Sequence, residues 1–246
     1  MIQLDSPCTT SLETPMTTKV ASITSHVSPW LAPLIYSLGH YLVLPLYFRQ
    51  IEIAGQENVP TTGPVILAPT HRAWWDSILV AYATGRLVTG RDLQFMVSIN
   101  EFNKGLQGWF IRRLGGFPID PERPGIAPLR HGVEILQQGQ MLVMFPEGNY
   151  FRDGYVHPLK PGLARLALNT ETSHPGLDVK ILPIGISYSQ AFPRRGCDVN
   201  IRIGSPLRVA EYSTGAVKQN AKQLTADLET ALKQLSGQPT FEPSIH

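Results

Sequence analysis

Two short apolar runs, each followed by a proline and then by polar residues, constrain the fold of this chain most strongly. Residues 65–68 read VILA and precede Pro69, and residues 141–145 read MLVMF and precede Pro146. Apolar runs of this length without alternation predict strands buried on both faces, as in a parallel sheet. Ligands of open α/β sheets bind outside the carboxyl ends of the strands. We therefore expect the polar residues after each proline to share one edge of a sheet.

The pattern around these two runs predicts an α/β domain. Further strands are predicted at residues 51–54, 93–97, 117–119, 180–187 and 199–203, and helices at residues 77–83, 128–138, 161–168 and 217–235. Strands that alternate with helices indicate a mainly parallel sheet flanked by helices. Pro183 lies inside one predicted strand and has no N–H, so we expect it at a sheet edge or a bulge.

The predicted domain, residues 50–237, lies between segments of a different character. Residues 1–28 are rich in Ser and Thr and contain no apolar core of signal-peptide length, so we expect a disordered leader. Residues 238–246 are expected to form a tail. Between leader and domain, residues 29–49 form an apolar segment that needs separate consideration.

Residues 30–48 of this segment contain no Asp, Glu, Lys or Arg. A membrane span needs about 20 apolar residues, but Pro33 and Pro45 interrupt this run. Trp30 and Tyr41 are among several amphipathic rings of the kind favoured at the depth of lipid headgroups. We expect an N-terminal helical segment, residues 29–49, that lies in or dips into one leaflet of a membrane. A buried hydrophobic hairpin is the alternative.

Composition agrees with a surface that is not wholly in water and excludes some classes of function. Charged residues make up 16% of the chain, against roughly 25% in an average soluble protein. The formal net charge of +2 is too small to indicate a nucleic-acid partner, although it permits an anionic membrane surface. Cys8 and Cys197 are isolated and lack metal-ligand spacing, so we expect a reducing compartment and no metal site.

The residues after the first apolar run suggest a catalytic dyad. His71 and Asp76 are five positions apart, a spacing that would separate them by roughly 140° on one helix at about 100° per residue. A shared site therefore requires His71 on the loop before the helix. A carboxylate that fixes one imidazole nitrogen leaves the other free as a general base. The alternative is that Asp76 only caps the helix that begins there.

A second polar cluster follows the second apolar run. Glu147 and Arg152 come after Pro146 and are expected near His71 at the sheet edge. Lys160 precedes a predicted helix start, where backbone N–H groups and a lysine can hold an anion together. Taken individually, each of these residues is better explained as an ordinary loop or surface charge, but two polar clusters that follow strands of one domain favour a shared site.

Four segments together resemble the membrane-associated glycerophospholipid acyltransferase family, which includes 1-acylglycerol-3-phosphate acyltransferase. They are THRAWWDS, FPEGNYFRDG with the following LKPG, ILPIGISY, and IRIGSPL, which occur in this order within residues 51–209. The H-x-x-x-x-D element is unspecific alone, whereas its combination with F-P-E-G about 70 residues later is specific. The resemblance implies transfer of a fatty acyl group from acyl-CoA or acyl-carrier protein to a lysophospholipid hydroxyl, with no cofactor or metal.

The resemblance also implies roles for single residues. His71 would be the general base and Asp76 its orienting partner. The acceptor-binding residues would be Glu147, Gly148, Asn149, Lys160 and Gly162. The expected localisation is the cytoplasmic face of a membrane, with membrane lipid as acceptor.

The sequence departs from the family pattern where family members bind the acceptor phosphate. Tyr150 stands where the F-P-E-G block usually has an arginine, and Pro121 stands where another arginine is expected. Arg152 and Arg123, each two residues further on, are the candidate replacements. A lysophosphatidic acid acceptor therefore competes with another lysolipid or an amine acceptor. A non-catalytic lipid-binding module is the alternative from a different class, whereas a serine hydrolase lacks its G-x-S-x-G motif.

Overall fold

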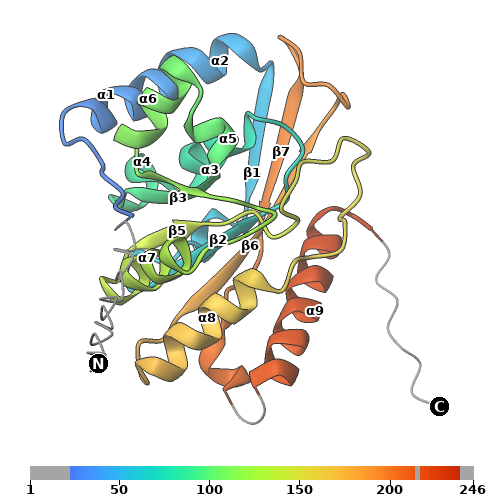
Figure 1. The fold of residues 1–246 in the computed structure, drawn as a ribbon. Helices are drawn as coiled ribbons and strands as arrows, with labels where there is room; N and C mark the ends of the chain where they lie inside the picture. The colour runs from blue at the N-terminus through green and yellow to red at the C-terminus, as the bar shows by residue number, and fades with distance from the viewer. Residues whose placement is uncertain (1–22, 214–216, 239–246) are drawn as a thin grey trace, which may run out of the picture.

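The computed structural model describes residues 23–213 and 217–238, and its centre is a single mixed sheet (Figure 1). Its strands, in spatial order, are β1 (Gln50–Ala54), β7 (Asp198–Ile203), β6 (Lys180–Tyr188), β2 (Val65–Pro69), β5 (Met141–Val143), β3 (Leu93–Ser98) and β4 (Gly116–Ile119), with β8 (Leu207–Arg208) paired to β6. The five strands from β6 to β4 are parallel. Strand β7 is antiparallel to β6, and β1 is parallel to β7. The predicted α/β fold with a mainly parallel sheet is confirmed.

Helices cover both faces of this sheet. They are α1 (Leu31–Leu38), α2 (Leu44–Tyr47), α3 (Asp76–Thr84), α4 (Arg86–Thr89), α5 (Ile99–Phe102), α6 (Gly105–Arg113), α7 (Ile126–Gln137), α8 (Gly162–Ser173) and α9 (Val217–Leu235), with a π-helical turn at Gly39–Val43. In Figure 1, α7, α8 and α9 lie below the sheet, and α1 to α6 gather above it. The π-helical turn joins α1 to α2 without a break in the chain's helical course.

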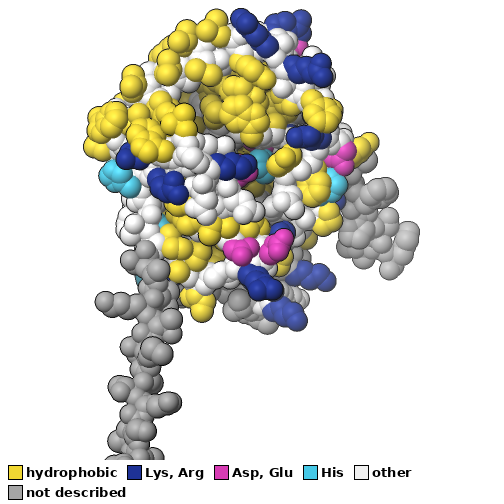
Figure 2. All heavy atoms as spheres, turned by 45° about the horizontal axis from the view of Figure 1, so that its top comes forward, with side chains coloured by type: hydrophobic (Ala, Val, Ile, Leu, Met, Phe, Trp, Pro, Cys, Tyr) yellow, Lys and Arg dark blue, Asp and Glu magenta, His cyan; other side chains and the backbone are white. Residues whose placement is uncertain are grey.

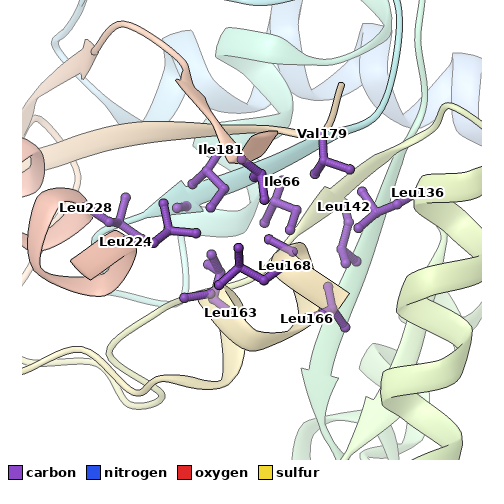
Figure 3. Packing of buried hydrophobic residues seen from close by; sticks show 14 of the residues in the cluster. Ile66, Leu136, Leu142, Leu163, Leu166, Leu168, Val179, Ile181, Leu224 and Leu228 are labelled. Atoms are coloured by element: carbon purple, nitrogen blue, oxygen red, sulfur yellow. The ribbon is translucent and has the colours of Figure 1, made fainter. Parts of the chain in front are cut away.

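The first apolar run forms β2, which lies in the middle of the sheet and is fully buried. Because successive side chains of a strand point to opposite faces, β2 contributes to two cores. Ile66 and Ala68 pack with α7, α8 and α9, as Figure 3 shows for Ile66 among leucines of these helices. Val65 and Leu67 pack with α2 and α3 on the other face. The strand is therefore fixed from both sides, which also fixes the loop that follows it.

Pro183 does not lie at a sheet edge, because β6 is flanked by β2 and β7, but the pairing on one side of β6 is irregular at this residue. Two residues of β6, Leu182 and Pro183, face three residues between β7 and β8, residues 204–206, which is the mismatch of a bulge. On one side, β6 pairs with β8 at Lys180 and Ile181 and with β7 only from Ile184 onward. Pro183 lies between the two stretches, so its missing N–H removes no bond from either ladder.

The N-terminal apolar segment is helical, as predicted, but it is neither fully buried nor fully exposed. Leu31, Ala32 and Leu44 are buried, whereas Leu34 and Leu46 are exposed. Within residues 23–213 and 217–238, no helix has both the length and the apolarity to cross a bilayer.

The ends of the chain differ partly from the predicted leader and tail. Val27 forms a bridge with Leu114, and Ser25 hydrogen-bonds the His131 ring, so residues 23–28 are part of the folded domain. Residues 1–22 of the predicted leader lie outside the described residues. In the predicted tail, Gln238 donates to the carbonyl of Gly154, and residues 239–246 are likewise outside the described part.

Candidate active site

The loop after β2 brings His71 and Asp76 together. Helix α3 begins at Asp76, so His71 lies on the preceding loop, as a shared site requires. The His71 Nδ1 is 2.8 Å from Asp76 Oδ2. The same oxygen accepts the backbone N–H groups of Arg72 at 2.5 Å and Ala73 at 2.7 Å. Asp76 therefore binds the imidazole and two backbone N–H groups of the loop before α3, and these bonds fix the loop and do not cap the helix.

The contacts of the His71 residue fix its ring and leave one nitrogen open. Its N–H donates to Glu147 Oε2 at 2.8 Å, its carbonyl accepts from Phe151, and its ring stacks on Phe145 with centroids 4.0 Å apart. A carboxylate can only accept, so Nδ1 carries the proton in this pair and Nε2 is the basic nitrogen. Nε2 makes no hydrogen bond to any group in the described part of the chain, and the side chain is 19% exposed. The site thus offers an oriented base.

The Glu147 carboxylate differs from the expected acceptor-binding role. Its side chain is fully buried and does not line the cavity. One oxygen accepts from the His71 backbone, the other from the His157 backbone at 2.9 Å, and both accept from the Arg72 guanidinium at 3.0 and 3.1 Å. Glu147 therefore joins the loops after β2 and β5. Sequence reasoning missed this role and also missed Arg72. The sequence predicts that the two loops are neighbours, but it does not show which of their charged side chains are buried and paired.

His71 opens onto a cavity of about 1910 Å³. Of the residues predicted from the second cluster, the cavity lining includes Gly148, Asn149, Arg152, Lys160 and Gly162. Arg123 is exposed and outside the lining, although its neighbours Pro121 and Pro124 belong to it. The structure therefore brings together both predicted clusters but not Arg123. Its backbone N–H instead donates to Asp120 in a tight turn.

The walls of this cavity are mainly apolar. Helices α1, α3, α6, α7 and α8 contribute the apolar side chains, among them Ile35, Ile78, Phe110, Leu129, Val133 and Leu166. Figure 2 shows apolar side chains gathered around a hollow, with Lys and Arg side chains between them. A chain of methylene groups fits such walls better than a polar substrate does.

Cations outnumber acids in the cavity lining. Lys160 lies over Gly148, since a Cβ added at Gly148 would be 2.6 Å from the Lys160 Cε. Arg152 packs over the rings of Tyr150 and Phe192. Two further lining arginines, Arg130 of α7 and Arg165 of α8, were not predicted from the sequence. The signal was weak, because each is a single charge on the polar side of an amphipathic helix.

No carboxylate in the described part of the chain neutralises these four cations. Among residues 23–213 and 217–238, no ion pair involves Arg130, Arg152, Lys160 or Arg165. Glu101 is the acid that the described lining contains, and it pairs with Lys104. An excess of unpaired cations favours binding of an anionic group.

Comparison with known proteins places this site in a family. A family model described as Acyltransferase matches residues 50–187, more than half of the chain's 246 residues. The chain belongs to the acyltransferase family. The dyad, the F-P-E-G block and most of the cavity lining of this acyltransferase lie within the residues that the model matches.

Curated relatives and a solved structure agree with this assignment. The chain is 28% identical over 151 residues to a 1-acyl-sn-glycerol-3-phosphate acyltransferase of Streptococcus pneumoniae, covering 59% of this chain and 51% of that protein. It is 23% identical over 188 residues to the enzyme of that name from Bacillus subtilis, covering 75% and 87%. The crystal structure of the 1-acyl-sn-glycerophosphate acyltransferase PlsC from Thermotoga maritima matches with a TM-score of 0.62 at 20% identity, covering 86% and 82%, and supports the fold. The aligned region thus spans about half the length of the Streptococcus relative.

The described residues also bear on metal binding. No group of three or more His, Cys, Asp or Glu side chains within them is placed to hold a metal ion. That the reaction needs no metal stays a prediction from the family resemblance.

Proposed function

We propose that this acyltransferase moves a fatty acyl group from a thioester donor, acyl-CoA or acyl-carrier protein, to the free hydroxyl of 1-acylglycerol-3-phosphate. The observation that carries the proposal is the His71 ring, which Asp76 fixes at Nδ1 and which is open at Nε2 onto an apolar cavity. The cations of this cavity have no acidic partner in the described part of the chain. The product would be phosphatidic acid.

The proposed reaction assigns one proton relay to His71. Its Nε2 takes the proton of the acceptor hydroxyl as the oxygen attacks the thioester carbonyl. The tetrahedral intermediate collapses, the carbon–sulfur bond breaks, and the leaving thiolate takes the proton back from the imidazolium. Asp76, which is fully buried, stabilises the imidazolium between the two transfers. The ester bond replaces the thioester bond, and no redox partner is required.

The size of the cavity supports a lipid substrate. Its volume of about 1910 Å³ exceeds the roughly 300–1,000 Å³ of a typical small-molecule pocket. Two hydrocarbon chains, one on the acceptor and one on the donor, would account for this excess. The apolar walls from α1, α3 and α6 are the candidate surface for these chains.

The charges of the lining support an anionic acceptor over a neutral one. Arg130, Arg152, Lys160 and Arg165 lack acidic partners among the described residues, and a phosphomonoester supplies the missing negative charge. The names of the bacterial relatives point to the same acceptor. We assign to these cations the binding of the acceptor phosphate, for which family members use the two arginines that are Pro121 and Tyr150 here.

The exposed apolar residues support action at a membrane surface, which we propose to be the cytoplasmic face. Trp30, Leu34, Tyr41 and Leu46 of the N-terminal helical segment are exposed. Further exposed apolar surface comes from Trp74, Leu106 and Ile126 on three other segments, and all three side chains also line the cavity. A lipid acceptor would then enter the cavity without crossing water.

An acceptor panel tests the proposal. Purified full-length protein on vesicles is given radiolabelled acyl-CoA or acyl-carrier protein with 1-acylglycerol-3-phosphate, zwitterionic lysolipids, monoacylglycerol, glycerol-3-phosphate or a long-chain amine. We expect labelled phosphatidic acid from the first acceptor. Transfer to another acceptor alone would replace the substrate assignment. Lipid binding without any release of free CoA or carrier protein would favour the non-catalytic lipid-binding module.

A histidine pair provides the matched control for the base. His71→Ala should reduce the rate by about 10²–10⁴-fold, the usual contribution of a general base. His174→Ala changes a histidine at the far end of α8 that contacts Gln137, and should leave the rate unchanged. Full activity in a folded His71→Ala protein would refute the assigned base.

A further inference from the structure

The Asp76 carboxylate has a second contact besides the dyad. Its Oδ2 binds the imidazole and the two backbone N–H groups, whereas its Oδ1 accepts a hydrogen bond from the Tyr188 hydroxyl at 2.5 Å. Tyr188 is the last residue of β6 and lies opposite Val199 of β7 in the antiparallel pair. A residue 112 positions away along the chain thus completes the set of donors around Asp76.

We propose that Tyr188 is a positioning residue that fixes the plane of the Asp76 carboxylate and thereby aims the His71 ring. The inference rests on the proposed acyl transfer, because it gives Tyr188 a role in that reaction and no contact with the substrate. Tyr188 does not line the cavity, so any effect on the rate has to pass through Asp76.

The geometry explains why the second oxygen needs a partner. The rotation of a carboxylate about its last bond is broad and poorly restrained by sterics alone. Donors on Oδ2 fix one oxygen, and the Tyr188 hydroxyl fixes the other, so together they define the plane. The Asp76 side chain is fully buried, so no water from bulk solvent replaces a lost donor without cost.

The environment of Tyr188 keeps it in the donor form. Burial raises the pKa of Tyr188 far above its ordinary value, and the negative charge of Asp76 raises it further. The phenol therefore stays protonated at physiological pH. Its ring lies near Phe48, with centroids 6.2 Å apart, and packs against the core on the α2 and α3 face. The hydroxyl is held in place by this packing and does not depend on Asp76 for its position.

The first experiment compares two tyrosines that both donate to a carboxylate. Tyr188→Phe removes one hydroxyl and keeps the packed ring. Tyr212→Phe does the same to a tyrosine that donates to Asp227 of α9 at 2.8 Å, on the other core face. We expect Tyr188→Phe to lower kcat by roughly ten- to a hundredfold, the range for a lost hydrogen bond to a charged group, with KM unchanged. Tyr212→Phe should leave both constants unchanged. A Tyr188→Phe protein with full kcat overturns the proposal.

A double-mutant cycle asks whether Tyr188 acts through Asp76. If it does, the loss caused by Tyr188→Phe should largely vanish in the Asp76→Asn background, because the carboxylate it orients is absent. Additive losses in the double variant would mean that Tyr188 acts by another route, and the proposal would be wrong.

Nitrogen NMR of the histidine rings gives a readout that needs no substrate. His71 signals are identified by their loss in His71→Gln. We expect wild-type His71 to be a single Nδ1–H form, and Tyr188→Phe to shift or broaden those signals while Tyr212→Phe does not. Unchanged His71 signals in Tyr188→Phe contradict the proposal. Because this measurement is independent of acyl transfer, it still decides the role of Tyr188 if the acceptor panel shows no activity.

Discussion

The guanidinium of Arg72 and the carboxylate of Glu147 form a buried ion pair that joins the two loops of the active site. Their side chains are 6% and 0% exposed, and Arg72 also donates to the His71 carbonyl. Neither residue lines the cavity, and Glu147 additionally accepts a hydrogen bond from the His71 N–H. The position of the loop that carries His71 thus depends on a residue from the loop after β5.

Removing the charge of Glu147 should therefore destabilise the protein and disable the site together. Glu147→Gln leaves Arg72 buried without a counter-charge, and breaking such a pair from one side costs about 3–5 kcal/mol. We expect a lower free energy of unfolding in urea and a large fall in kcat. Asp198→Asn, which breaks the exposed pair with Arg49, is the control and should leave both the free energy of unfolding and kcat nearly unchanged. Normal stability in Glu147→Gln would show that the ion pair does not hold the loops.

A pair of glycine variants should separate the effect of displacing Lys160 from the effect of backbone strain at Gly148. Gly148 has a φ of +74°, and Gly139 has a φ of +68°, so alanine at either position should cost about 1–3 kcal/mol. A Cβ at Gly139 meets nothing within 4 Å, whereas a Cβ at Gly148 would push against the Lys160 side chain. We expect similar losses of stability in thermal unfolding but reduced kcat/KM in Gly148→Ala only. Equal activity in both variants would argue against a role for the placement of Lys160.

The sequence predicted the part of the site that is local and missed the part assembled across the sheet. His71 and Asp76 are close along the chain, and the strand–proline pattern placed Gly148 and Lys160 near them. Arg130 and Arg165 reach the cavity through the packing of α7 and α8, which no local pattern encodes. Tyr188 ends the ILPIGISY segment, but only the position of β6 beside β2 brings its hydroxyl to Asp76. Glu147 was found at the right place with the wrong role, since burial of a loop carboxylate depends on its partner Arg72. Arg123 fails for a local reason, because its backbone takes part in a turn.

The acceptor phosphate should depend on Arg130 and Arg165 and not on Arg123. Each of the first two lines the cavity without an acidic partner among the described residues, whereas Arg123 lies outside the lining. We expect Arg130→Ala and Arg165→Ala to raise KM for 1-acylglycerol-3-phosphate about tenfold, as for loss of a charge-assisted contact. Arg123→Ala should leave KM unchanged.

The KM for the donor has to be measured as well, because acyl-CoA also carries phosphates that Arg130 and Arg165 could bind. KM is therefore measured separately for acceptor and donor, and again with a zwitterionic lysolipid. A rise confined to acyl-CoA would assign the arginines to the donor. Unchanged KM values for every substrate would remove Arg130 and Arg165 from the site.

The exposed leucines of the N-terminal helical segment should determine membrane binding. Leu34 and Leu46 are each 58% exposed, and burying a methylene group contributes about 0.8 kcal/mol. Leu34→Ser with Leu46→Ser should weaken binding to anionic vesicles about tenfold or more in a sedimentation assay, while activity on a short-chain acceptor below its micelle concentration is retained. Tyr155→Ser, at an exposed aromatic outside the cavity lining, is the control and should bind as the wild type does. If the double serine variant binds vesicles normally, another surface of the protein makes the membrane contact.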